Sequence, residues 1–414
     1  MTNTFDLIVI GAGASGLMAA GVAAEKGKKV LLLEKMDQPG RKLRITGKGR
    51  CNLTNICDVD EFQKHIGKNG RFLKAAFSSF FHQQLIQFFE EKNVKLAMER
   101  GSRVFPQSGK AQDIFFALIH WIEGMDVVLM RNSKVAQILT EQNGVRGVLL
   151  ENGSIYYTSK IILATGGKSY PLTGSDGSGY KLAEEVGHSL TPLFPALVPI
   201  NVIEEIPSFL NGLELKNVRL SVFENNQKIA EEFGDLSFTS KGITGPIVLT
   251  ISRQVTSRLN SRVVLKATLD LKPALDHDKL EQRLLRDISE LKNQPVQVLF
   301  RRLMPMTFMN YFADRAQLSL RKPTSSLTAI DRKNIRMLLK EFSLTLWSTA
   351  SWSEAIITQG GIPLSEVDSQ TMESKKVKGL YVAGEILDLD ADTGGYNLQI
   401  AFSTGYFAAL NASF

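Results

Sequence analysis

The sequence has too few cysteines for a disulfide scaffold or a structural metal site. Cys51 and Cys57 are the only two among 414 residues, and they are not paired with histidines at the spacing of a zinc site. So few cysteines are typical of a protein from a reducing compartment, and we expect a cytoplasmic location.

A long hydrophobic run is also missing. The apolar stretch near the N-terminus, residues 7–24, is interrupted by four glycines and followed by Glu25 and Lys26, and no basic segment precedes it. We therefore expect neither a signal peptide nor a membrane span. The hydrophobic content of 43% and charged content of 22% exclude disorder, and the length predicts two or three domains.

The first 34 residues carry a dinucleotide-binding pattern. A short apolar run, residues 5–10, ends at GAGASG, a helix-like segment follows, and a second apolar run, residues 29–33, ends at Glu34. In this βαβ unit Gly11 permits a tight turn, Gly13 lets the backbone approach a pyrophosphate, and Gly16 lets the helix pack on the strand. Glu34 lies 18 residues beyond Gly16, where a carboxylate can bind ribose hydroxyls and would repel a 2′-phosphate. The pattern predicts FAD or NAD rather than NADP.

The remainder of the chain predicts further domains. Residues 129–164 contain short β-rich runs, and we expect an antiparallel meander with turns at Asn143-Gly144 and Asn152-Gly153. Residues 194–272 alternate apolar and polar positions, including PIVLTIS at 246–252, and predict a small barrel or sandwich. Residues 278–341 have helical spacing, with a helix-start box from Thr328 to Asp331.

The helical segment is basic. Residues 278–341 contain 13 Lys and Arg against 7 Asp and Glu, so they carry nearly all of the chain's net charge of +7. This charge is the one feature that favours a nucleic-acid partner, and aromatic residues for base stacking are sparse there. We therefore treat RNA docking as the alternative hypothesis and expect a nucleic-acid partner to be absent.

Two motif-like segments do not meet the requirements of their sites. Gly167-Lys168-Ser169 resembles the end of a P-loop, but Ile162 stands where the first glycine is needed. The alternating aspartates 388, 390 and 392 lack the glycine and glutamate of a calcium loop. We expect no ATP site and no metal.

Two further segments favour FAD over NAD. The loop GRKLRITGKGRCNLTN, residues 40–55, can wrap a pyrophosphate, and GLYVAGEILDLDADTGGYNLQIAFSTG, residues 379–405, returns to the same site. With ILATGG at 162–167 and TQGGI at 358–362, they resemble the three-domain bacterial flavoprotein family that includes BaiN and aminoacetone oxidase.

The resemblance implies an α/β fold with a Rossmann-like, glutathione-reductase-like FAD-binding domain, an inserted β-barrel and a nested helical subdomain. We place the FAD-binding domain at 1–193 and 357–414, the barrel at 194–273 and 342–356, and the helical insert at 274–341. The cofactor implied is non-covalent FAD. Beside Gly11, Gly13, Gly16 and Glu34, its expected neighbours are Ala14, Ser15, Lys35, Arg41, Lys42, Gly49, Arg50, Cys51, Asn52, Val135, Ala164, Thr165, Gly166, Gly384, Glu385, Asn397, Leu398, Gln399 and Ile400.

Within that set, Glu385 is expected to bind a ribityl hydroxyl. A helix starting near Asn397 would direct its positive end at the flavin. No acid or base for catalysis is evident in the sequence. We expect Cys51 to pack rather than to relay electrons, and His188 to be a helix C-terminal residue rather than a catalyst. Arg103, Tyr170 and Tyr396 are candidates for lining a substrate cavity.

The function expected is an FAD-dependent oxidoreductase acting on a small molecule. It is either an amine-type oxidase or a reductase of an activated double bond, and the sequence does not separate the two.

Overall fold

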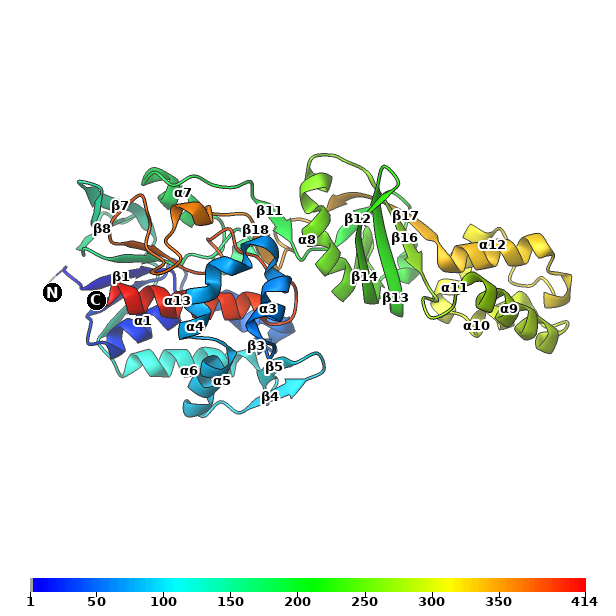
Figure 1. Ribbon diagram of the computed structural model, residues 1–414, viewed down its shortest axis with the longest axis horizontal. Coiled ribbons are helices and arrows are strands. Elements are labelled where there is room, and N and C mark those ends of the chain that lie inside the picture. Colours follow the sequence, from blue (N-terminus) through cyan, green and yellow to red (C-terminus); the bar gives the residue numbers. More distant parts are fainter. Residues whose placement is uncertain (1–2) are drawn as a thin grey trace. The chain divides into compact units, whose positions relative to one another are not determined.

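The computed structural model describes residues 3–414, which form two compact units. The first unit comprises the described residues up to 195 together with residues 355–414, and the second comprises residues 196–354. The first unit is therefore discontinuous in sequence, as Figure 1 shows by its blue and red segments. β11 (Phe194–Ala196) pairs with β18 (Ile357–Gln359) where the chain leaves the first unit and returns to it.

A five-stranded parallel sheet forms the centre of the first unit. Its order is β19-β10-β1-β2-β6, so that β1 lies in the middle. Every residue of β1 and β2 is buried, as is typical of the strands of a parallel sheet. The chain order reverses between β1 and β10, which is where α/β sheets form ligand crevices. The strands are β1 (Leu7–Ile10), β2 (Val30–Leu33), β6 (Val127–Met130), β10 (Ile161–Leu163) and β19 (Leu380–Val382).

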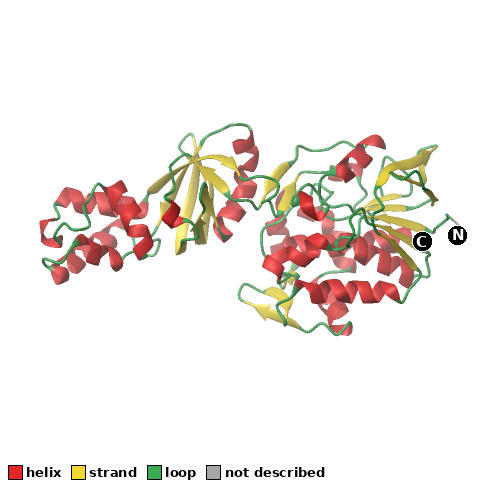
Figure 2. Cartoon of the chain, turned by 180° about the vertical axis from the view of Figure 1, so that it is seen from behind, coloured by secondary structure: helices red, strands yellow, loops and turns green. Residues whose placement is uncertain are grey.

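Two long buried helices pack on this sheet and on each other. α1 (Ala14–Glu25) follows β1, and α13 (Tyr396–Ala412) follows β19; the two lie side by side (Figures 1 and 2). A Cβ on Gly405 of α13 would lie 2.3 Å from the Ser15 carbonyl oxygen, so this close approach requires glycine. The other helices of the unit are α2 (Arg41–Ile45), α3 (Val59–Ile66), α4 (Lys74–Ser79), α5 (His82–Glu91), α6 (Ala111–Glu123) and α7 (Ser178–Glu185).

The expected antiparallel meander is shorter than predicted. It consists of β7 (Val135–Glu141), β8 (Gly144–Leu150) and β9 (Ile155–Tyr157), while the runs at 127–130 and 161–163 belong to the parallel sheet as β6 and β10. The first turn also differs, because the left-handed residues are Gln142 and Asn143 rather than Asn143 and Gly144. A second small sheet orders β3 (Thr54–Asn55), β5 (Arg103–Pro106) and β4 (Leu96–Glu99).

The second unit contains a closed six-stranded barrel. Its order is β12-β15-β14-β13-β16-β17. The prediction of a strand at PIVLTIS is wrong, because residues 246–260 form the helix α8. Gly245 and Pro246 begin that helix, and its buried residues recur at helical spacing. The elements are β12 (Ile200–Val202), β13 (Glu214–Glu224), β14 (Gln227–Phe238), β15 (Gly242–Thr244), α8 (Pro246–Asn260), β16 (Leu265–Asp270) and β17 (Phe342–Thr349).

Four helices lie between β16 and β17 in sequence. Their core is aromatic, with Phe300, Phe308 and Phe312 fully buried near Phe342. The predicted helix-start box is confirmed, since Thr328 and Asp331 cap each other's backbone N–H groups. The fold class predicted from the sequence is thus confirmed, whereas the division of the second unit into two domains stays a prediction. The helices are α9 (His277–Leu291), α10 (Val296–Arg301), α11 (Met306–Ala316) and α12 (Ala329–Lys340).

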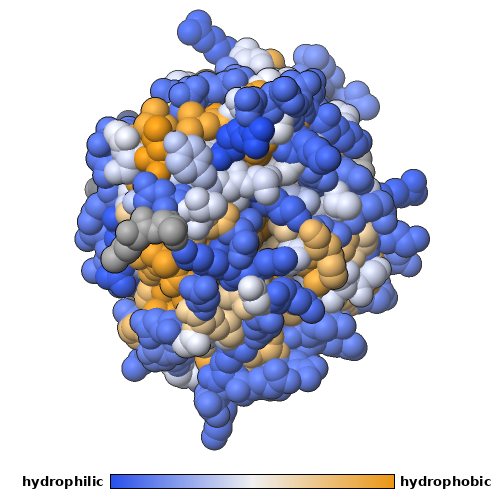
Figure 3. All heavy atoms as spheres, turned by 90° about the vertical axis from the view of Figure 1, so that its left-hand side faces the viewer, coloured by the Kyte–Doolittle hydropathy of each residue, from blue (hydrophilic) through white to orange (hydrophobic). Residues whose placement is uncertain are grey.

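None of the helices within residues 3–414 combines the length and apolar character needed to cross a membrane. Figure 3 shows the face of the molecule on the side of the N-terminus, where hydrophilic residues dominate and hydrophobic residues form separate patches.

Candidate functional site: the dinucleotide crevice of the first unit

The three glycines after β1 have three different surroundings. A Cβ on Gly11, whose φ is +102°, would lie 2.6 Å from the Ala164 carbonyl oxygen, and a Cβ on Gly16 would lie 1.8 Å from the carbonyl oxygen of Gly11. Gly11 and Gly16 are therefore required by the packing of the protein itself. A Cβ on Gly13 would meet nothing within 4 Å, so this glycine, at the N-cap of α1, faces open space. An open backbone at a helix N-terminus suits the approach of a pyrophosphate.

Glu34 directly follows β2, as predicted, and is buried. Its carboxylate accepts hydrogen bonds from the backbone N–H of Ala12, at 3.0 Å, and of Met36, at 2.9 Å. Burial raises the pKa of Glu34 above its ordinary value, although both backbone bonds act in the opposite direction. The acid is thus fixed beside the glycine turn, where the ribose of a dinucleotide would lie.

The loop after α2 adopts an unusual backbone. Gly47, Lys48, Gly49 and Cys51 all have positive φ, and a Cβ on Gly49 would meet nothing within 4 Å. Cys51 is fully buried, which raises its pKa to about 12, so the thiol stays protonated at neutral pH. This agrees with the packing role expected of Cys51.

Two buried polar atoms near the crevice have no partner within residues 3–414. They are Oδ1 of Asn52 and Oγ1 of Thr165, both on residues expected beside FAD. A buried polar atom without a hydrogen bond is costly, and a bound polar ligand can supply the missing partner. Together with the open faces of Gly13 and Gly49, these atoms fit an FAD molecule.

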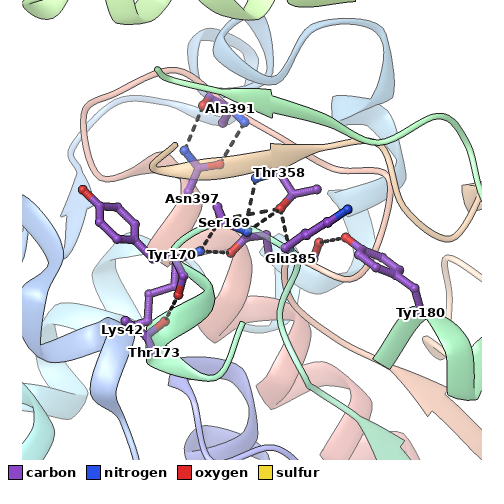
Figure 4. A network of polar contacts seen from close by, with 10 residues as sticks. Lys42, Ser169, Tyr170, Thr173, Tyr180, Thr358, Glu385, Ala391 and Asn397 are labelled. Carbon is purple, nitrogen blue, oxygen red and sulfur yellow. Dashed lines mark hydrogen bonds and ion pairs between the residues drawn. The ribbon is translucent and has the colours of Figure 1, made fainter. Parts of the chain in front are cut away.

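A polar network joins four segments of the chain near the carboxyl edge of the parallel sheet (Figure 4). Lys42 Nζ donates to Glu385 Oε2 and to Ser169 Oγ, both at 2.6 Å. The other oxygen of Glu385 accepts from Ser169 Oγ at 2.7 Å and from the Thr358 backbone N–H at 2.8 Å. Tyr180 donates to the Glu385 carbonyl oxygen at 3.4 Å, and burial raises the pKa of its phenol. Both carboxylate oxygens of Glu385 are thus engaged inside the protein, and its expected bond to a ribityl hydroxyl would be an additional one.

Ser169 and Thr358 were not among the predicted site residues. They lie 189 positions apart in sequence, and each stands beside a glycine-rich segment, GG at 166–167 and GG at 360–361. The glycines beside Ser169 follow β10 of the parallel sheet, so the edge-of-sheet rule could have identified Ser169. Thr358 lies in β18 of the separate two-stranded sheet, and only its glycine-rich neighbours could have pointed to it.

The start of α13 is fixed by side chains. The helix begins at Tyr396, one residue before the predicted position, and Asn397 binds both backbone groups of Ala391 (Figure 4). Gln399 is fully buried and its side chain bonds to Thr54 and Ser403, so its contact with a cofactor stays a prediction. Leu398 is half-buried and Ile400 is buried in the core.

The remaining predicted neighbours of FAD divide into two groups. Lys35, Arg41 and Arg50 form ion pairs with Asp176, Asp37 and Glu99, respectively, so that their charges are partly neutralised. The others have backbone or buried positions close to the crevice, and their contact with FAD stays a prediction: Ala14 and Ser15 begin α1, Val135 begins β7, Ala164 and Gly166 follow β10, and Gly384 follows β19.

The candidate substrate and catalytic residues occupy varied positions. Arg103 is exposed, Tyr170 has a left-handed backbone, and Tyr396 is buried with its ring stacked 4.2 Å from that of His65. His188 lies beyond the end of α7, and its fully buried ring contacts Glu366 and Ser374, both at 2.8 Å. The prediction that His188 is a helix C-terminal residue is thus wrong, and its non-catalytic role stays a prediction.

The two rejected motifs contribute structural contacts. Ile162, the residue that excludes a P-loop, lies inside β10, and the Lys168 backbone N–H donates to Thr358 Oγ1 at 2.7 Å. Asp392 bonds to His65 at 3.0 Å. Within residues 3–414 no three His, Cys, Asp or Glu side chains are grouped to hold a metal ion.

A parallel sheet with this glycine turn, a buried acid after the second strand and a C-terminal helix that returns to the same edge defines a dinucleotide-binding oxidoreductase. Residues 5–411 match the family described as the HI0933-like protein Rossmann domain, and the chain belongs to this family. Its cofactor is FAD, and it is an FAD-dependent oxidoreductase, which confirms the family expected from the motifs.

Relatives match the whole chain. A 3-dehydro-bile acid delta(4,6)-reductase of Clostridium scindens is 29% identical over 407 residues, 98% of each chain. A ribosomal RNA dihydrouridine synthase of Escherichia coli is 31% identical over 410 residues, 98% of this chain and 97% of the relative. A solved 3-ketosteroid delta1-dehydrogenase from Sterolibacterium denitrificans has a TM-score of 0.54 at 14% identity and covers 100% of both chains, which shows a shared fold.

Proposed function

We propose that this chain is an FAD-dependent reductase of a carbon–carbon double bond conjugated to a carbonyl group, and that its substrate is a uracil ring in RNA. One observation carries the reductase assignment. Two full-length relatives of similar identity have names that describe very different substrates but the same kind of bond. A delta(4) bond beside a 3-oxo group and the C5=C6 bond of uracil are both conjugated to a carbonyl.

FAD, when bound and reduced by an electron donor, would supply the hydride for such a reaction. Saturation of a conjugated double bond adds the hydride to the carbon remote from the carbonyl and a proton to the carbon beside it. The residues of this chain have to hold the nucleotide half of FAD, through Gly13 and Glu34. They also have to orient the flavin ring at the carboxyl edge of the sheet. The network of Lys42, Ser169, Thr358 and Glu385 holds four segments of the chain in one arrangement near that edge.

The choice of RNA over a small enone is supported by the helices of the second unit. Residues 278–341 have a net charge of +6, and a polyanionic substrate would be attracted by them. RNA, the alternative hypothesis from the sequence alone, thereby becomes the favoured substrate. A steroid-like enone remains the second candidate, because the bile-acid reductase is as complete a relative as the RNA enzyme.

The test is a single-turnover oxidation of chemically reduced holoenzyme under anaerobic conditions. We expect a ribosomal RNA fragment to reoxidise the flavin saturably and to gain two hydrogens at one uridine, detected by mass spectrometry. The matched control is the same RNA with that uridine replaced by dihydrouridine, which should leave the flavin reduced. Rapid reduction of the oxidised holoenzyme by an amine, with no response to either RNA or enone, would instead establish the oxidase.

A further inference from the structure

Three arginines of the helical region converge on one buried aspartate. Nε of Arg283 lies 3.6 Å from Asp287 Oδ2, Nε of Arg286 lies 3.7 Å from Asp287 Oδ1, and Nη1 of Arg302 lies 3.5 Å from the same Oδ1. The Asp287 side chain is 6% exposed, whereas those of Arg283, Arg286 and Arg302 are 32%, 66% and 40% exposed. We call Arg283, Arg286 and Arg302 the arginine cluster.

The cluster keeps an excess of positive charge. Arg302 also pairs with Glu290 at 2.6 Å, so two carboxylates oppose three guanidinium groups. Arg301, the preceding residue, is exposed and has no ion pair with any residue in the described part of the chain. With Arg301 the local net charge is +2.

Internal contacts leave donors of the cluster free. A guanidinium group has five N–H donors, and the guanidinium group of Arg286 makes no hydrogen bond to any residue within 3–414. The distances of 3.5 to 3.7 Å to Asp287 are those of ion pairs without a short hydrogen bond. Arg283 Nη2 donates to the Arg302 carbonyl oxygen at 3.1 Å and Arg302 Nη1 donates to Glu290 at 2.6 Å, so most N–H donors of the three guanidinium groups have no hydrogen bond inside the described part of the protein.

A second arginine group in the same helices shows the contrast. Arg332 and Arg336 both bond to Glu281, at 3.2 and 3.3 Å, and both are only 23% exposed. These two charges serve a contact between α9 and α12. The Arg286 side chain is 66% exposed and its Nε lies 3.7 Å from Asp287, and exposed Arg301 forms no ion pair within residues 3–414. Exposed charges of this kind contribute little to stability, so stability alone explains these two arginines poorly.

From this geometry we infer that the arginine cluster, with Arg301, binds the phosphate backbone of RNA. Guanidinium groups bind phosphate oxygens through two parallel N–H bonds, and several of them held at fixed spacing suit a chain of phosphates. Contacts of this kind position an RNA without reading its sequence. The inference rests on the proposed function, because it concerns how the same RNA substrate is held.

The test compares two double variants of the FAD-loaded full chain. Arg286→Ala/Arg301→Ala removes two charges from the proposed surface. Arg146→Ala/Lys216→Ala removes two exposed charges elsewhere, since the side chains of Arg146 on β8 and Lys216 on β13 are 62% and 69% exposed. Binding of a fluorescent ribosomal RNA fragment is measured by anisotropy over a range of salt concentrations, with the flavin absorbance and melting temperature of each protein as folding controls.

We expect the cluster variant to bind RNA roughly tenfold more weakly at physiological salt. Its slope of log affinity against log salt should fall by about 1.4, because each of the two phosphates no longer neutralised contributes about 0.7 to the slope. The other variant should match the parent protein.

Equal RNA binding by both variants and the parent would overturn the inference, even if the parent reduces RNA. RNA binding that depends on the arginine cluster, without any reduction of uridine, would overturn the proposed substrate but not the inferred RNA-binding surface. Saturation of the cluster by inorganic phosphate at micromolar concentration would overturn RNA as its ligand.

Discussion

The carboxylate of Glu34 is buried, which disfavours its charge, and it accepts two backbone hydrogen bonds, which favour its charge. Its carboxylate lies between two backbone N–H groups, yet burial still raises its pKa above the ordinary value of 4.5. Ribose hydroxyls that donate to this group would favour the ionised form, so FAD binding should lower the pKa and release protons.

FAD affinity should therefore weaken as the pH falls through the raised pKa of Glu34, and level off above it. Glu34→Gln should weaken FAD binding by about 1 to 3 kcal/mol, because it removes a hydrogen bond to a charged group, and should abolish this pH dependence. Fluorescence titration of apoprotein with FAD between pH 4.5 and 8 measures both effects. Glu25→Gln at the other end of α1 is the control, and an equal weakening there would refute the role of Glu34.

The same pKa shift bears on stability without the cofactor. A carboxyl group whose folded pKa is raised contributes stability that is complete below the unfolded pKa and is lost as pH rises through the folded pKa. The free energy of unfolding of the apoprotein should thus decline with rising pH in the range above 4.5, and less so in Glu34→Gln.

Cys51 should be inert. Its pKa of about 12 keeps the fully buried thiol protonated, and thiolate is the reactive form. Native holoenzyme should resist iodoacetamide at this residue at about pH 8, whereas denatured protein should be labelled rapidly, as peptide mass spectrometry would show. Cys51→Ala should keep single-turnover activity. An inactive variant that still binds FAD would instead support a role of the Cys51 thiol in electron transfer.

At the scale of elements, the glycine turn separates packing from ligand binding. A Cβ on Gly16 meets the Gly11 carbonyl oxygen at 1.8 Å, whereas a Cβ on Gly13 meets only open space. Both residues belong to one motif, and each can be changed to alanine with the same gain of one methyl group.

Gly16→Ala should lower the unfolding free energy of the apoprotein by about 1 to 3 kcal/mol, the usual cost of overpacking. Gly13→Ala should change it by less than about 1 kcal/mol, since only an N-cap preference is removed, but should weaken FAD binding strongly. Thermal melts of apoprotein and FAD titrations check the pair. Equal effects of the two substitutions on melting would contradict the distinction.

Elements with strong local signals were predictable from the sequence, and those that depend on distant partners were not. The glycine turn, the acid after β2 and the Thr328 box are set by residues a few positions apart. The segment 246–252 is rich in β-branched residues, which favour a strand locally. Its residues are buried at helical spacing only when they pack on the rest of the second unit. Strands β6 and β10 have ordinary β-rich sequences, so their place in the parallel sheet is decided by tertiary pairing alone.

The same limit applied to the site. Lys42 and Glu385 are 343 positions apart, and their ion pair beside Ser169 has no local pattern. The family resemblance located these segments, but only the structure shows that they bond to one another.

At the scale of the whole molecule, only one Rossmann unit is present in the described chain. Flavin enzymes of the glutathione-reductase type that use pyridine nucleotides carry a second such unit, and here the chain inserts a barrel and helices. Direct reduction of the flavin by NADH or NADPH should be slow and should not saturate at millimolar concentration in anaerobic stopped-flow experiments. Saturation at micromolar NADPH would show that a nicotinamide site exists without a second Rossmann unit.

The discontinuity of the first unit also constrains how the protein is made. Strand β19 and helix α13 follow residues 196–354 in the chain, so a ribosome completes the whole barrel and helical region before it supplies them. Until then β10 has an unpaired edge and α1 lacks the helix that packs on it. A growing chain therefore exposes an apolar sheet edge throughout the synthesis of the second unit, and FAD can bind tightly only once the chain is complete. Because the last two elements of the site follow an inserted unit, we expect the growing chain to depend on chaperones during synthesis. We also expect FAD to be taken up by completed chains and not by growing ones.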